Sequence, residues 1–144
     1  MGLDIVVHLP VDSEQSINSL VADIGQDFPT AKIGLEVRSR KLLASEIVLA
    51  IVINVVSSLT YDIVKRILSD LSKRGVKDSY LEPELRRAVA ESFLIRSAVK
   101  GLKLDSMSDS GEKSTYLFRD NKKHKHTIVV HSNGNIDYNP SSSP

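Results

Sequence analysis

The feature that most constrains the fold is a run of uncharged, mostly apolar residues in the first half of the chain. Between Glu46 and Asp62 the sequence reads IVLAIVINVVSSLTY. A membrane-spanning helix needs about 20 predominantly apolar residues, whereas this run is shorter and is interrupted by Asn54 and two serines. We therefore expect a segment buried in the core, and membrane attachment through Ile47–Tyr61 is the less favoured alternative.

The same run is compatible with two kinds of secondary structure. Its many β-branched residues suit a buried strand as well as a helix. Length favours the helix, because strands of more than about 10 residues are unusual. From Leu59 to Leu71 the apolar residues follow helical spacing. We predict one long apolar helix over about residues 41–72, with a break near the serine pair that precedes Leu59.

The residues before this run predict a strand, a helix and a second strand. Apolar residues alternate with others from Leu3 to Leu9, and Pro10 ends the pattern. Apolar residues then recur at helical spacing from Ile17 to Phe28, and alternation returns over residues 31–38. This order indicates a βαβ unit at the N-terminus.

The second half predicts a further helix and then a sheet. Glu82-Pro83-Glu84 is typical of a helix start, and the helix extends over about residues 82–100. A polar loop is expected over residues 106–114. Three strands should follow as an antiparallel β-meander, over residues 115–119, 127–131 and 136–138, with a turn at Asn133-Gly134. The class is therefore α+β, with one compact domain over residues 1–139 and a disordered tail over 140–144.

The sequence lacks the motifs of the common catalytic and cofactor-binding sites. It contains no cysteine, and its scattered glycines form no phosphate-binding loop. Tyr61 and Lys65 have the spacing of a dehydrogenase pair but no dinucleotide motif beside them. His124 and His126 are the candidate metal ligands, with a solvated hairpin tip as the preferred interpretation. We predict no catalytic, cofactor or metal residues, and an enzyme whose site is assembled from distant residues is an alternative.

The N-terminus carries no recognisable targeting signal. Asp4 occupies the region where a secretory signal needs basic residues. We therefore expect a soluble protein in the cytoplasm.

A basic segment near the C-terminus suggests binding of a polyanion. Residues 113–126 contain a single acid, Asp120, and two aromatic residues, Tyr116 and Phe118, that share a strand face. Proteins that bind single-stranded nucleic acid combine basic groups with aromatic rings on which bases stack. Against this, the core also needs these two of the seven aromatic residues, and a solvated basic hairpin is the preferred interpretation. The candidate polyanion-binding residues are Arg119, Lys122, Lys123 and Lys125.

The favoured hypothesis is a non-enzymatic interaction or regulatory module of the bacterial type, with an inhibitory, immunity-like or oligomerising role. A protein partner or a second copy of the chain would contact an apolar seam at Leu49, Ile53 and Val56, if these side chains project outward. The acids of the first helix would offer a second surface, for a basic partner. The alternative is nucleic-acid or polyanion binding through the basic hairpin.

Overall fold

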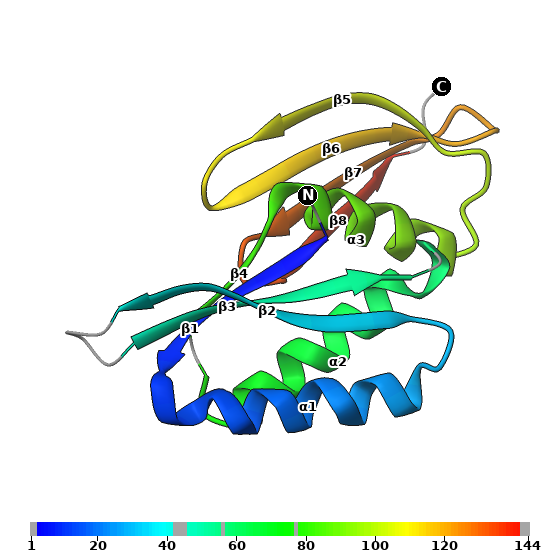
Figure 1. Cartoon of the computed structure of the whole chain (residues 1–144). Coiled ribbons are helices and arrows are strands. Elements are labelled where there is room, and N and C mark those ends of the chain that lie inside the picture. Colours follow the sequence, from blue (N-terminus) through cyan, green and yellow to red (C-terminus); the bar gives the residue numbers. More distant parts are fainter. Residues whose placement is uncertain (1–2, 42–45, 56, 77, 142–144) are drawn as a thin grey trace.

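The computed structural model of the chain describes residues 3–41, 46–55, 57–76 and 78–141 and confirms the α+β class (Figure 1). An N-terminal strand-helix-strand unit and a C-terminal antiparallel meander are present, as predicted. The elements in chain order are β1 (Asp4–Pro10), α1 (Glu14–Asp27), β2 (Lys32–Lys41), β3 (Glu46–Asn54), α2 (Thr60–Lys73), β4 (Ser79–Leu81), α3 (Pro83–Arg96), β5 (Lys103–Asp109), β6 (Lys113–Arg119), β7 (Lys125–His131) and β8 (Ile136–Ser141).

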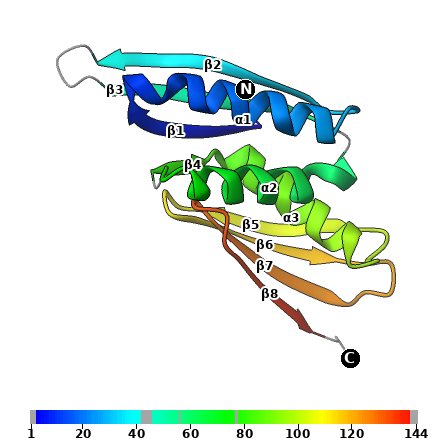
Figure 2. The same ribbon diagram turned by 90° about the horizontal axis from the view of Figure 1, so that it is seen from below.

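The first six of these elements form one sheet with two helices on one face. The strand order is β2-β3-β1-β4, and every neighbouring pair is antiparallel. The strands β1 and β2 are therefore parallel to each other, with β3 between them. This βαββαβ order is the split βαβ, or ferredoxin-like, topology. Helices α1 and α2 lie side by side on the same side of the sheet (Figures 1 and 2).

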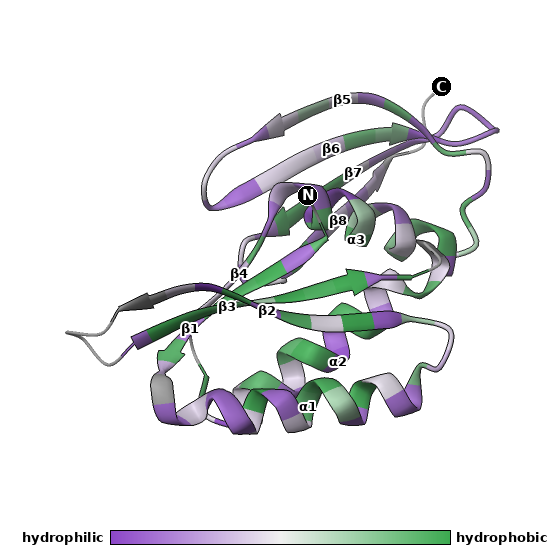
Figure 3. Ribbon diagram, in the orientation of Figure 1, coloured by the Kyte–Doolittle hydropathy of each residue, from purple (hydrophilic) through white to green (hydrophobic). Residues whose placement is uncertain are grey.

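The prediction of one long helix over residues 41–72 is wrong in its first half. Residues Glu46–Asn54 form β3, a central strand, and the helix α2 begins only at Thr60. Every residue from Ile47 to Ile51 is buried, so β3 is covered on both faces and is almost uniformly apolar (Figure 3). A strand buried on both faces loses the alternation that distinguishes it from a buried helix.

The second half forms a separate sheet in the order β5-β6-β7-β8, with α3 packed on one face. The strand β5 was missed, because its exposed, serine-rich sequence is typical of a loop. At the other end of the sheet, β8 includes Pro140 and Ser141, which we expected in a disordered tail. Residues 142–144 lie outside the described part of the chain.

A single hydrophobic cluster connects the two sheets. It contains residues of both, among them Ile51 from β3 and Ile128 from β7. The backbone N–H of Leu81, in β4, donates to the carbonyl of Ser132 in the β7–β8 turn, at 2.8 Å. Arg86 of α3 is fully buried where the two halves meet. Within the described ranges, no helix has the length and apolar character needed to cross a membrane.

Candidate nucleic-acid interface

The register of the second sheet places three cations in one row. Lys103 on β5 pairs with Arg119 on β6, which pairs with Lys125 on β7. Residues directly opposite each other share a face, and strands lie about 4.8 Å apart, so the row spans about 10 Å. Like charges in such positions repel each other. One carboxylate offsets this repulsion: Asp105 accepts a hydrogen bond from Nε of Arg119, at 3.0 Å.

The β6–β7 turn adds two exposed lysines beside this row. Lys122 and Lys123 occupy the tip of the turn, and Lys123 has a φ of 65°. The turn is held by Asp120, whose Oδ1 accepts the backbone N–H groups of Lys122 at 2.8 Å and His124 at 2.9 Å. These two lysines therefore extend from an ordered backbone.

The segment between α3 and β5 brings the backbone of a sixth cationic residue, Lys100, next to this turn. The backbone N–H of Asn121, in the β6–β7 turn, donates to the carbonyl of Lys100 at 3.0 Å. The neighbouring Gly101 lies so close that a Cβ there would be 2.8 Å from the Cβ of Asn121. We call the resulting cluster the basic corner. It consists of Lys100, Lys103, Arg119, Lys122, Lys123 and Lys125.

The structure thus brings all four predicted polyanion-binding residues together and adds two that the sequence analysis missed. Lys100 and Lys103 lie around β5, which was not expected as a strand. The alternation of Leu102 and Leu104 with Lys103 and Asp105 is the signal that could have revealed it.

Asp120 also anchors a partly buried series of hydrogen bonds that joins three side chains. With the imidazole of His126 neutral and its proton on Nε2, this nitrogen donates to Oδ2 of Asp120 at 3.0 Å. The hydroxyl of Tyr138 then donates to Nδ1 at 2.7 Å. The hydrogen bond from His126 is the main cause that lowers the pKa of Asp120 to about 2, with further help from the backbone N–H groups of the turn. Asp120 therefore stays ionised at neutral pH and holds the turn.

The hydrogen-bonded series Asp120–His126–Tyr138 has the order acid, histidine, hydroxyl that activates a nucleophile in hydrolases. The charge and burial around Tyr138 nevertheless oppose such a role. Burial raises the pKa of the Tyr138 hydroxyl, and the nearby charge of Asp120 raises it further. Both effects disfavour the phenolate. The arrangement is thus suited to stabilising the hairpin rather than to activating Tyr138.

The two candidate metal ligands take different environments. Both ring nitrogens of His126 are engaged in the hydrogen-bonded series above, while Nδ1 of His124 lies 3.6 Å from Asp120. In the part of the chain that the structure describes, no three histidine or acidic side chains form a group suited to a metal ion.

Tyr116 and Phe118 belong to the core, as the sequence analysis also expected, and are not available for base stacking. Tyr116 and Phe118 are almost fully buried, on the face of the sheet that packs against α3. The basic row lies on the opposite face, because Arg119 follows Phe118 in a strand and side chains alternate. A nucleic acid at the basic corner would therefore not stack on these rings.

The predicted apolar seam is not available at two of its three residues. Leu49 and Ile53 have exposed fractions of 0% and 2% and belong to the core, so they do not project outward. Val56 lies outside the described residues.

The acids of the first helix are also partly engaged within the chain. On α1, Asp27 pairs with Arg66 of α2, and Asp23 lies 3.9 Å from Arg74. These ion pairs leave less negative charge for a basic partner than the sequence suggested.

No family model matches the sequence, and neither the curated proteins nor the solved structures include a significant match to the chain.

Proposed function

We propose that the protein is a non-enzymatic module that binds nucleic acid through its phosphate backbone at the basic corner. The observation that carries this proposal is the convergence of six cationic residues from two separate segments of the chain. One of them, Arg119, forms an ion pair with Asp105, at 3.0 Å. Cations gathered in this way repel one another unless anions neutralise them. Phosphates do so and release their counterions, which makes such binding favourable and salt-dependent.

The surroundings of the basic corner favour contacts to phosphates over contacts to bases. The outer face of the second sheet carries small or aliphatic side chains next to the basic row, including Leu117 and Thr127. In Figure 1, α3 covers the inner face of this sheet and no described element lies over the outer face. A strand of nucleic acid could therefore reach the row, but it would find no aromatic platform there. We infer weak sequence preference.

A binding assay with two matched double variants tests this function. Fluorescence anisotropy of a labelled 20-nucleotide single strand would be measured at low salt with the wild type, with Lys122→Glu/Lys123→Glu and with Lys32→Glu/Lys73→Glu. All four lysines are exposed, and both variants change the net charge equally. The corner variant should bind at least tenfold more weakly than the wild type, while the control should stay within about threefold. Equal losses in the two variants would contradict the proposal.

A protein-interaction module remains a second proposal, on a different surface from the predicted ones. Leu49 and Ile53 no longer support it, but an apolar groove beside the edge strand β5 does. For either function we propose a cytoplasmic location, as the sequence analysis expected.

A further inference from the structure

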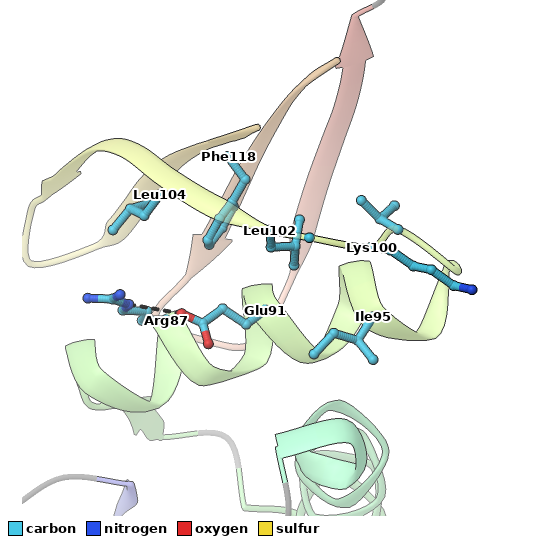
Figure 4. Close-up of a pocket in the computed structure, with 9 residues that line it drawn as sticks. Arg87, Glu91, Ile95, Lys100, Leu102, Leu104 and Phe118 are labelled. Carbon is cyan, nitrogen blue, oxygen red and sulfur yellow. Dashed lines mark hydrogen bonds and ion pairs between the residues drawn. The ribbon is translucent and has the colours of Figure 1, made fainter. Parts of the chain in front are cut away.

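A groove runs between α3 and the edge strand β5 (Figure 4). Its volume is about 490 Å³. In Figure 4 the side chains of Leu104 and Phe118 extend from the sheet toward the helix, and Ile95 lies on the helix across the gap. The lining combines an apolar floor with a charged rim. The apolar residues are Ile95, Val99, Leu102, Leu104 and Phe118, and the charged ones are Arg87, Glu91 and Lys100.

The groove exists because the helix does not cover the whole sheet. Helix α3 packs against β6 and β7, which leaves the inner side of β5 without a helix beneath it. Of the three large apolar side chains that are exposed in the described residues, Ile95 lines this space, with an exposed fraction of 42%. Met107, further along β5, has an exposed fraction of 43%. Met107 is opposite the buried Tyr116 and therefore shares its inward-facing side.

The outer edge of β5 offers backbone hydrogen bonds next to the groove. Within the described part of the chain β5 ends its sheet, so one side of its backbone faces no further strand. Edge strands are commonly protected by charges and bulges. In β5 the register shift lies between Leu104 and Ser106, and the residues Ser106–Ser108 beyond it carry neither a charge nor a proline.

The rim carries a net positive charge at one end. Nε of Arg87 donates to Glu91 at 3.0 Å, so these two charges neutralise each other. Lys100 also lines the groove. An acidic group of a ligand would balance its charge.

We propose that the groove and the edge of β5 bind an extended peptide of a partner protein. The peptide adds as a strand beside Ser106–Asp109, places apolar side chains against Ile95 and Leu104, and directs an acidic residue toward Lys100. Strand addition of this kind obtains affinity from backbone hydrogen bonds and specificity from alternate side chains in pockets. The site shares Lys100 with the basic corner but does not include Lys122 or Lys123, so variants of these two lysines test the nucleic-acid proposal separately.

A random peptide library selected on the full chain tests the proposal without assuming a sequence. The probe is a phage-displayed library of 12-residue peptides, and enriched peptides are then synthesised and titrated. We expect apolar residues at alternate positions together with an acid. Ile95→Asp should weaken binding at least tenfold. The control Val37→Asp replaces a similarly exposed residue on β2, with an exposed fraction of 46%, and should leave binding unchanged. Two versions of the peptide would carry N-methyl groups on alternate residues, one version at the odd positions and the other at the even positions. Only one of the two sets of N–H groups faces β5 in a paired strand, so one version should lose binding and the other should keep it.

Three outcomes would overturn the proposal. The first is a selection that enriches no peptide. The second is a set of enriched peptides that bind the Ile95→Asp variant as well as the wild type. The third is binding that tolerates backbone methylation at the odd positions and also at the even positions, which would exclude strand addition. Lys122→Glu/Lys123→Glu should retain peptide binding, so a failure of the nucleic-acid proposal would be seen separately.

Discussion

Arg86 of α3 forms hydrogen bonds with both sheets, to β4 of the first and to β6 and the β5–β6 turn of the second. Its Nε donates to the carbonyl of Leu81 at 2.8 Å, and its two terminal nitrogens donate to the carbonyls of Ser110 at 3.0 Å and Gly111 at 3.1 Å. A further bond at 3.2 Å reaches the hydroxyl of Ser114. The guanidinium thus holds the β5–β6 turn against the end of β4. Its planar fork of donors fits several carbonyls at once, which an ammonium group does not.

Replacing Arg86 by lysine should therefore destabilise the protein. Lysine keeps the charge but cannot reach all four acceptors, and we expect a loss of about 2–4 kcal/mol in the free energy of unfolding. Urea denaturation followed by circular dichroism measures this loss. The control is Arg87→Lys at the next position, an exposed residue for which a change within about 0.5 kcal/mol is expected. Similar losses in both variants would contradict the role given to Arg86.

Gly134 in the β7–β8 turn provides a second test at this scale. Its φ is +94°, and a Cβ there would lie 2.1 Å from a methyl carbon of Leu68 on α2. Gly134→Ala should cost about 1–3 kcal/mol through backbone strain and displacement of Leu68. Gly111 lies in the β5–β6 turn and has open space around its Cβ position. If Gly111→Ala were as costly as Gly134→Ala in the same urea titration, close packing would not explain the effect.

At the scale of elements, the basic hairpin depends on an ionised Asp120. The pKa of this carboxyl is about 2 in the fold, against an ordinary value of 3.8. A lowered pKa in the folded state stabilises the protein above the unfolded value and loses this contribution as the pH falls through the folded value. The contribution of Asp120 should therefore be complete above about pH 4.5 and nearly lost near pH 2.

Asp120→Asn tests this dependence. The wild type should be more stable than the variant at pH 6, and the difference should shrink between about pH 4 and pH 2, because protonation removes the same charge. Urea midpoints measured at each pH give the difference. Asp137→Asn is the matched control, since Asp137 also pairs with a histidine, His131, but its side chain is 75% exposed. An equally large, pH-dependent difference for that variant would show that Asp120 has no special role.

Among the helices and strands, some could be predicted from the sequence and others could not. The strand β1, the helix α1 and the strands β6 and β7 were predicted correctly, because one face of each is buried and the other is not, which preserves the period. The strands β3 and β5 break this condition in opposite ways. The first is covered on both faces, and the second is largely exposed, so neither shows the alternation of a half-buried strand.

The candidate site was predicted in part for the same reason. Arg119 and Lys125 lie on correctly predicted strands, whereas Lys103 joins them through the pairing of β5 with β6 and Lys100 through the backbone hydrogen bond from Asn121. A contact between segments far apart in sequence leaves no local pattern. The sequence shows that Tyr116 and Phe118 share a strand face but leaves open whether this face belongs to the core or to a binding surface, and the structure places it in the core.

At the scale of the whole molecule, the charges are distributed unevenly although the net charge is only +1. The helix α1 and the second sheet lie at opposite sides of the molecule (Figure 1). On α1, Asp27 pairs with Arg66 of α2 and Asp23 lies near Arg74 just beyond it, while the basic corner keeps most of its charge. A polyanion would therefore approach the side of the molecule that carries the second sheet, because the field of clustered charges orients such encounters.

The salt dependence of single-strand binding tests the basic corner most directly. The affinity of the labelled strand would be measured from about 50 to 200 mM salt, where each phosphate contact contributes about −0.7 to the slope of log affinity against log salt. Six cations, each with one phosphate contact, predict a slope of about −4 for the wild type. Lys122→Glu/Lys123→Glu should make it shallower by about 1.4 or more, and Lys32→Glu/Lys73→Glu should leave it unchanged. A wild type that does not bind, or a slope that the corner variant does not alter, would contradict the account.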